Sequence, residues 1–105
     1  MVAHLDTKND VMKFISEAGN SLVVLDFFAT WCGPCKKIAP VLEAISKEHP
    51  GVKFAKIDVD TDQDSTEHFN ITGMPTFVFF KNGAELERFS GANEATLRST
   101  IAKHQ

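Results

Sequence analysis

Apolar residues follow two different spacings in this sequence, and the two spacings alternate along the chain. Between 7 and 19 they share one helical face, which predicts an amphipathic helix that starts after Thr7 and ends at Gly19. Between 22 and 29 the sequence LVVLDFFA is almost continuously apolar and rich in strand-forming residues. We therefore expect a helix followed by a central strand that is buried on both faces.

The rest of the chain continues this alternation. Further strands are predicted at 2–5, 52–59, 76–80 and 86–89, and further helices at 34–49, at 62–69 and from 93 onward. Asn82-Gly83, between the last two strands, is a strong signal for a tight antiparallel hairpin. Strands that alternate with helices indicate an α/β fold, and the sequence has no repeat or linker, so we expect one domain over residues 1–105.

Charge and hydropathy narrow the range of possible functions. Fourteen acidic and eleven basic residues give a net charge of −3, and the basic residues are spread along the chain, so nonspecific binding of nucleic acid is not expected. No segment has the apolar run of a signal peptide or the roughly 18 apolar residues of a membrane span. The expectation is a soluble, cytoplasmic protein without membrane contact.

The two cysteines form a single Cys-x-x-Cys motif, Cys32-Gly33-Pro34-Cys35, between the central strand and the following helix. The amino end of a helix presents free N–H groups and partial positive charge, which stabilise a thiolate. A free cysteine has a pKa of about 8.5, so this placement raises the reactive fraction of Cys32. We expect Cys32 to be the nucleophile, and Cys35, one turn further into the helix and more buried, to attack the mixed disulfide that forms.

Two other interpretations of this motif compete with redox chemistry. A structural zinc site needs about four ligands, whereas the motif supplies two and the four histidines show no ligand spacing. A purely structural disulfide across so short a loop would stabilise the fold little. The acidic run from Asp58 to Asp64 lacks the glycine and the terminal glutamate of an EF-hand, so no metal is expected there either.

Several segments beyond the cysteine motif resemble the thioredoxin family, in matching order and spacing over the whole chain. They are Asp26, 29–36 (ATWCGPCK), Pro40, 58–60 (DVD), 74–77 (MPTF) and 90–93 (SGAN). The resemblance implies a thioredoxin fold with a central five-stranded mixed β-sheet flanked by four helices. It also implies a protein-disulfide reductase that binds no cofactor itself and receives electrons from NADPH through a flavoprotein thioredoxin reductase.

The resemblance also implies a docking surface for substrates around Cys32. Its expected members are Trp31, Gly33, Pro34, Met74, Pro75, Gly91 and Ala92. A proline before a strand is usually only a turn residue, but the resemblance implies a cis Met74–Pro75 bond and pairing of the Met74 backbone with the substrate. Some animal members carry an extra cysteine at position 73, where this chain has Gly73, so dimerisation through such a thiol is excluded and a monomer is expected.

One charged residue interrupts the central apolar strand. A buried carboxylate is costly unless it is paired or functional, so Asp26 is either a satisfied structural residue or part of the site. We expect burial to raise the pKa of Asp26, a nearby Lys56 to offset part of that rise, and Asp26 to accept a proton from Cys35.

Two functions remain open on the sequence alone. The first is a protein-disulfide reductase. The second is a binding module of the same fold, whose redox chemistry only switches its contact with a partner protein.

Overall fold

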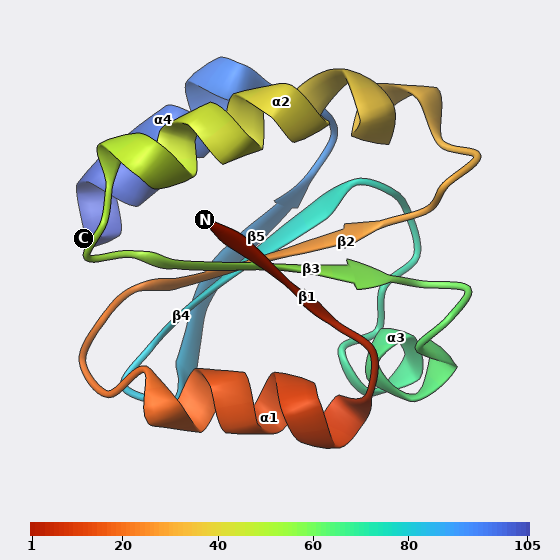
Figure 1. The fold of residues 1–105 in the computed structure, drawn as a ribbon, viewed down its shortest axis with the longest axis horizontal. Helices are drawn as coiled ribbons and strands as arrows, with labels where there is room; N and C mark the ends of the chain where they lie inside the picture. The colour runs from red at the N-terminus through yellow and green to blue at the C-terminus, as the bar shows by residue number, and fades with distance from the viewer.

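The computed structural model describes all 105 residues, and its strands and helices follow the predicted order (Figure 1). The strands are β1 (Val2–Leu5), β2 (Val23–Phe28), β3 (Lys53–Asp58), β4 (Thr76–Lys81) and β5 (Ala84–Ser90). The helices are α1 (Lys8–Glu17), α2 (Gly33–Glu48), α3 (Gln63–His68) and α4 (Glu94–His104). The alternating pattern of the sequence therefore predicts the type of every element.

The five strands form one mixed sheet in the order β1-β3-β2-β4-β5. The first three strands of this order are parallel, and β4 and β5 are antiparallel to their neighbours. This arrangement confirms the expected five-stranded mixed sheet with four helices. The strand β2 lies in the middle of the sheet, as its apolar sequence predicts.

Helices cover both faces of the sheet. In Figure 1, α2 and α4 lie above it and α1 and α3 lie below it. Alternate residues of this segment enter the two resulting cores: Val23 and Leu25 pack with α1, whereas Val24 of β2 and Leu22, just before the strand, pack with α2 and α4. Because both faces are covered, nearly every residue of β2 is buried, including its one charged residue.

Local signals fix the ends of several elements. Thr7 caps α1 by accepting a hydrogen bond from the Asp10 N–H, and Asn93 caps α4 in the same way through Thr96. Asn82 and Gly83 both have positive φ angles, which a two-residue hairpin of this type requires. No helix has the length and apolar character needed to cross a membrane.

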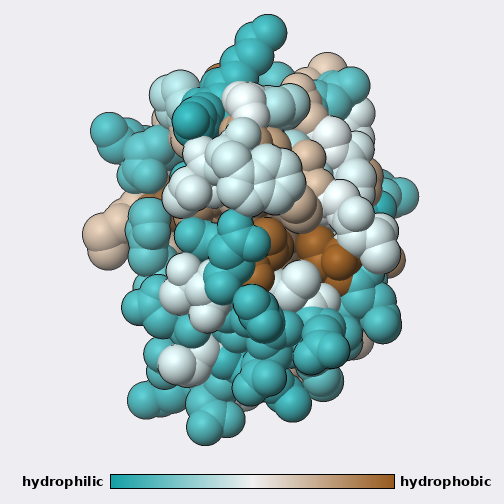
Figure 2. Space-filling model, turned by 90° about the vertical axis from the view of Figure 1, so that its right-hand side faces the viewer, coloured by the Kyte–Doolittle hydropathy of each residue, from teal (hydrophilic) through white to brown (hydrophobic).

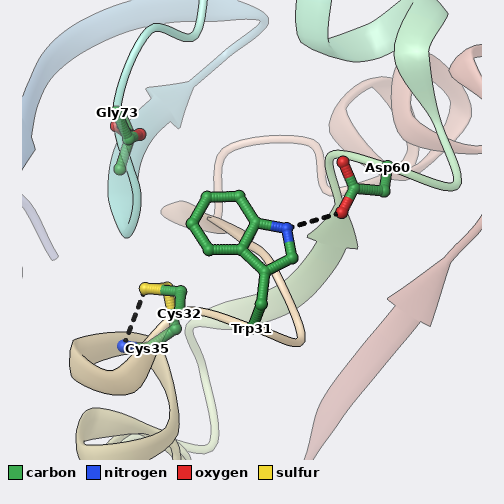
Figure 3. Close-up of a disulfide and its surroundings, with 6 residues drawn as sticks. Trp31, Cys32, Cys35, Asp60 and Gly73 are labelled. Atoms are coloured by element: carbon green, nitrogen blue, oxygen red, sulfur yellow. Dashed lines mark hydrogen bonds between the residues drawn. A yellow bond between two sulfur atoms is a disulfide. The ribbon is translucent and has the colours of Figure 1, made fainter.

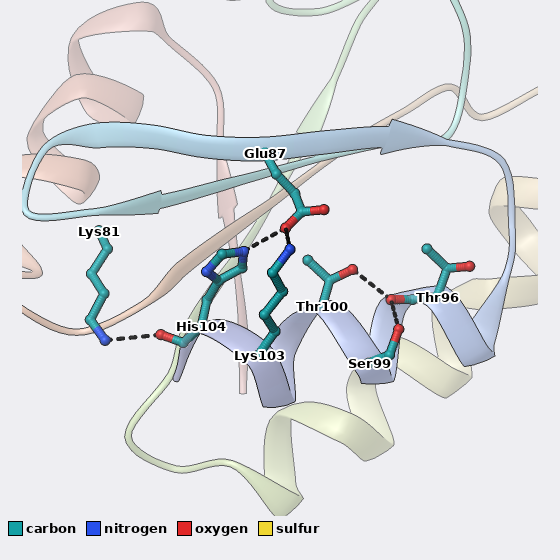
Figure 4. Close-up of polar contacts among 7 residues, drawn as sticks. All are labelled: Lys81, Glu87, Thr96, Ser99, Thr100, Lys103 and His104. Atoms are coloured by element: carbon teal, nitrogen blue, oxygen red, sulfur yellow. Dashed lines mark hydrogen bonds and ion pairs between the residues drawn. The ribbon is translucent and has the colours of Figure 1, made fainter.

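Polar contacts join the last helix to the edge of the sheet. The Glu87 carboxylate on β5 contacts the His104 ring and the Lys103 ammonium of α4 (Figure 4). The Lys81 ammonium, at the end of β4, donates to the His104 carbonyl at 2.9 Å. These contacts hold the end of α4 beside the β4–β5 hairpin, and β5 leads directly into residues 91 and 92.

Candidate active site

The cysteine pair lies where β2 ends and α2 begins. Cys32 is the residue that caps α2, and its Sγ accepts a hydrogen bond from the Cys35 N–H at 3.1 Å. The two residues form a disulfide, with their Cα atoms 5.3 Å apart. Gly33 and Pro34 occupy the exposed first turn between them. The predicted position at the helix amino terminus is therefore correct, and that terminus stabilises negative charge on Cys32 once the pair is reduced.

Both cysteines are nearly inaccessible in this oxidised form. Cys32 is 5% exposed and Cys35 is 3% exposed, so the expected difference in burial between them is small. The disulfide joins the two sulfurs and keeps both against the protein, which is the physical reason for their similar burial. Access to Cys32 therefore depends on the side chains that surround it.

One of these side chains is Trp31, which is 66% accessible. Its indole Nε1 donates a hydrogen bond of 2.9 Å to the Asp60 carboxylate (Figure 3). The Asp60 N–H in turn donates to the side chain of Asp58. An exposed aromatic ring is thus held in one orientation beside the disulfide.

This role of Asp60 is not evident from the sequence. The acidic residues from 58 to 64 have a spacing only loosely like that of metal ligands, and nothing in that spacing predicts an anchor for an aromatic ring. The one indication in the sequence that Asp60 belongs to the site is the 58–60 segment, which is part of the resemblance to the family.

Fluorescence should report the redox state of the pair. Trp31 is the only tryptophan and the chain has no tyrosine, so its emission is isolated from other residues. We expect the emission of oxidised and reduced protein to differ, because the ring lies beside the sulfurs that change. Spectra of both forms, with thiol counts to establish the redox state, test this, and Cys35→Ser under the same treatment is the control. Identical spectra for fully oxidised and fully reduced protein would show that the ring does not sense the sulfurs.

The opposite side of the site is built from two segments that flank the β4–β5 hairpin, one before β4 and one after β5. The Met74–Pro75 bond is cis, and the Gly91 N–H donates to the Pro75 carbonyl at 2.9 Å. Gly91 has a φ of +107°, which favours glycine at this contact. Pro75 is buried, Met74 and Gly91 are partly buried, and Ala92 is exposed.

These loops and the cysteine motif lie at the same end of the molecule. Figure 2 shows that end, with weakly polar and hydrophobic surface in the middle and strongly hydrophilic side chains around it. Met74 packs against the core cluster that contains Cys32 and Cys35, and the Pro75–Gly91 hydrogen bond brings the residues after β5 to the same end.

Within β2, the strand that leads to the cysteine pair, Asp26 is 1% exposed and neither of its carboxylate oxygens has a hydrogen-bond partner. Burial raises the pKa of this carboxyl from 3.8 to about 7, and the positive charge of Lys56 lowers it in part. Lys56 is paired with Asp26 in the β2–β3 register, so both side chains lie on the same face of the sheet. The burial and the direction of both effects are as expected from the sequence.

A pocket of about 210 Å³ lies between the start of α2 and the ends of β2 and β3. Its lining includes Cys35 and Lys56, together with Phe28, Ala29, Thr30, Lys36 and Ala39. The Lys56 ammonium lies 4.6 Å from the centre of the Phe28 ring. The pocket is large enough for water and adjoins Cys35, so it offers a route for proton movement near that residue.

The fold and the site define a dithiol/disulfide oxidoreductase. One cysteine of a Cys-x-x-Cys disulfide caps a helix, and an exposed aromatic ring and a cis-proline loop lie at the same end of the molecule. The strand that leads to the disulfide carries a buried carboxyl group with a pKa near neutrality.

Comparison with known proteins identifies the family. The thioredoxin family model matches residues 2–103. The thioredoxin of Ictalurus punctatus is 48% identical over 107 residues, which cover 100% of both chains. The thioredoxin of Homo sapiens is 44% identical over 101 residues, which cover 96% of each chain. The X-ray structure of Fasciola hepatica thioredoxin superposes with a TM-score of 0.97 at 52% identity, covering 99% of this chain and 100% of that one.

The chain belongs to the thioredoxin family. It is a protein-disulfide reductase, and the Cys32–Cys35 pair carries its dithiol/disulfide chemistry.

Proposed function

We propose that Cys32 and Cys35 act in sequence, the first as the nucleophile and the second as the resolving thiol. The observation that supports this most directly is the position of Cys32 as the residue that caps α2, where its sulfur accepts the Cys35 N–H. This hydrogen bond and the free N–H groups of the helix favour the thiolate of Cys32. Cys35, in contrast, lies within α2 and lines the pocket that also contains Lys56.

The proposed reaction has two exchange steps. The Cys32 thiolate attacks one sulfur of a substrate disulfide, which forms a mixed disulfide and releases the first substrate thiolate. Cys35 then loses its proton and attacks the Cys32 sulfur, which releases the second substrate thiolate and leaves the Cys32–Cys35 disulfide. The substrate gains two electrons and, once its thiolates are protonated, two protons.

Asp26 is the proposed acceptor of the Cys35 proton. Its carboxyl is buried, has no hydrogen-bond partner and has a pKa of about 7, so it exchanges protons readily at neutral pH. Lys56 has a supporting role, since its charge prevents the pKa of Asp26 from rising further. The transfer passes through water in the pocket beside Cys35 if the two groups are too far apart for direct contact.

Substrate docking is proposed for the surface formed by Trp31, Gly33, Pro34, Met74, Pro75, Gly91 and Ala92. No backbone hydrogen bond within the protein involves the N–H or C=O of Met74, so these groups are free to pair with an extended substrate chain. All of these residues come from one chain, which supports action as a monomer.

The electrons for each cycle are proposed to come from NADPH through a flavoprotein thioredoxin reductase, with no cofactor bound to this chain. A reducing cytoplasm is the proposed setting, because the cycle requires the pair to return to the dithiol form.

A coupled turnover assay tests this proposal. The protein is mixed with NADPH, a thioredoxin reductase and oxidised insulin, and the oxidation of NADPH is followed. We expect many turnovers per molecule for the natural chain and none for Cys32→Ser. A chain that stays reduced but never reduces insulin would contradict the reductase cycle and favour a binding module whose cysteines only switch a contact.

A further inference from the structure

Gly73 lies across the active site from Trp31. Figure 3 shows it on the loop that faces Cys32, with the indole ring between this loop and Asp60. The loop is held at this point, because the Thr76 hydroxyl donates to the Gly73 carbonyl at 2.6 Å and lies 2.9 Å from the Ser90 hydroxyl. Gly73 therefore occupies a fixed place at the edge of the docking surface.

The fold itself does not require glycine at this position. A Cβ atom added to Gly73 would meet no other atom within 4 Å, and the φ angle is outside the left-handed region. Gly83 and Gly91 differ from it, since both have the positive φ that favours glycine. A side chain at 73 would thus begin without a clash or backbone strain, at a position that lies on the loop facing Cys32 (Figure 3).

We infer that the missing side chain at Gly73 is a specificity determinant for substrates. The Trp31 ring is tied to Asp60 and limits the space on one side of Cys32, so the room at Gly73 is where a large residue next to the attacked cysteine can fit. The open space lets the natural chain accept disulfides whose cysteine is flanked by bulky side chains as well as those flanked by small ones. This inference rests on the proposed attack by Cys32.

Two synthetic peptide disulfides test the inference, one with glycine and one with phenylalanine on both sides of the attacked cysteine. The second-order rate constant for reduction of each peptide is measured by stopped flow with the fully reduced protein. For the natural chain we expect similar constants. For Gly73→Leu we expect the constant for the phenylalanine peptide to fall by about tenfold or more relative to the glycine peptide, and Gly73→Ala should give an intermediate ratio.

Gly51→Leu is the matched control. Gly51 also has open space around it and no positive φ, but it follows the far end of α2, roughly 24 Å along the helix axis from Cys32. Urea unfolding establishes that each variant is folded. An unchanged ratio in folded Gly73→Leu, or an equal change in Gly51→Leu, would overturn the inference. If the natural chain reduced neither peptide, the proposed function would fail first.

Discussion

Cys35→Ser is expected to trap substrate proteins as stable mixed disulfides through Cys32. In this variant the thiolate at the start of α2 can still attack, but the thiol that resolves the adduct is gone. Turnover of insulin should fall by about a thousandfold or more, the scale of loss when one member of a catalytic pair is removed. Mass spectrometry of the adducts after proteolysis identifies the sulfur that carries the substrate.

Cys32→Ser is the matched control, because it removes the other sulfur of the same pair. It should trap little, since the remaining Cys35 sulfur does not cap α2 and lacks the N–H hydrogen bond that favours the thiolate of Cys32. Equal trapping by both variants, or adducts that run through Cys35 in a chain with both cysteines, would contradict the assignment of nucleophile and resolving thiol.

Asp26→Asn is expected to stabilise the protein above neutral pH. The carboxyl has a pKa of 3.8 in its ordinary state and about 7 in the fold, so above pH 7 folding buries a charge that is unfavourable there. This difference corresponds to roughly 4 kcal/mol of lost stability. The buried amide of asparagine costs about 1–3 kcal/mol without hydrogen-bond partners, so we expect a net gain of about 1–3 kcal/mol at pH 8.

The stability of the natural chain should fall with rising pH because of Asp26. Between about pH 4 and pH 7 the folded chain keeps the proton of Asp26 and the unfolded chain has lost it, so the free energy of unfolding falls as pH rises through this window. Below the window both states hold the proton, and above it neither does. Asp26→Asn should lack this decline, and urea unfolding of both proteins at a series of pH values measures it.

The same substitution should slow the second step of the reaction. With no carboxylate to accept the Cys35 proton, the rate of resolution should fall by roughly 100-fold and lose its inflection near pH 7. Single-turnover reduction of a mixed disulfide across pH measures this rate. A variant that is less stable and equally fast would show that Asp26 has only a structural role.

Asp62→Asn is the matched control for Asp26→Asn, because it removes the charge of a buried aspartate that does have hydrogen-bond partners. Asp62 is also buried, but its carboxylate accepts hydrogen bonds from the Ser65 N–H and hydroxyl. Substitution there should lower stability and leave the resolution rate unchanged. A gain in stability in both variants would mean that the loss of any buried carboxylate stabilises this fold.

Three features of this protein are evident in the sequence because they depend on neighbouring residues. The spacing of apolar residues predicts each helix and strand, and turn residues such as Asn82-Gly83 mark where the chain reverses. The Cys-x-x-Cys motif between a strand and a helix predicts a stabilised thiolate. Asp26 is unusual on the sequence alone, because it is the one charged residue within the apolar β2 segment.

The docking surface was predicted only through the resemblance to the thioredoxin family, because its residues share no local sequence pattern. Trp31, Met74 and Gly91 are far apart along the chain, and propensity alone predicts an ordinary turn at Met74-Pro75. Their assembly depends on which strands are neighbours in the sheet.

Only the tertiary structure decided the contacts between distant segments. The hydrogen bond from Trp31 to Asp60 joins residues 29 positions apart, and the space at Gly73 depends on loops that meet at one edge of the sheet. The sequence could suggest Lys56 as a neighbour of Asp26, but the register between β2 and β3 places the two side by side. Register and loop contacts follow from how the two cores pack, and packing depends on the whole chain at once, whereas spacing and turn chemistry are set by residues a few positions apart.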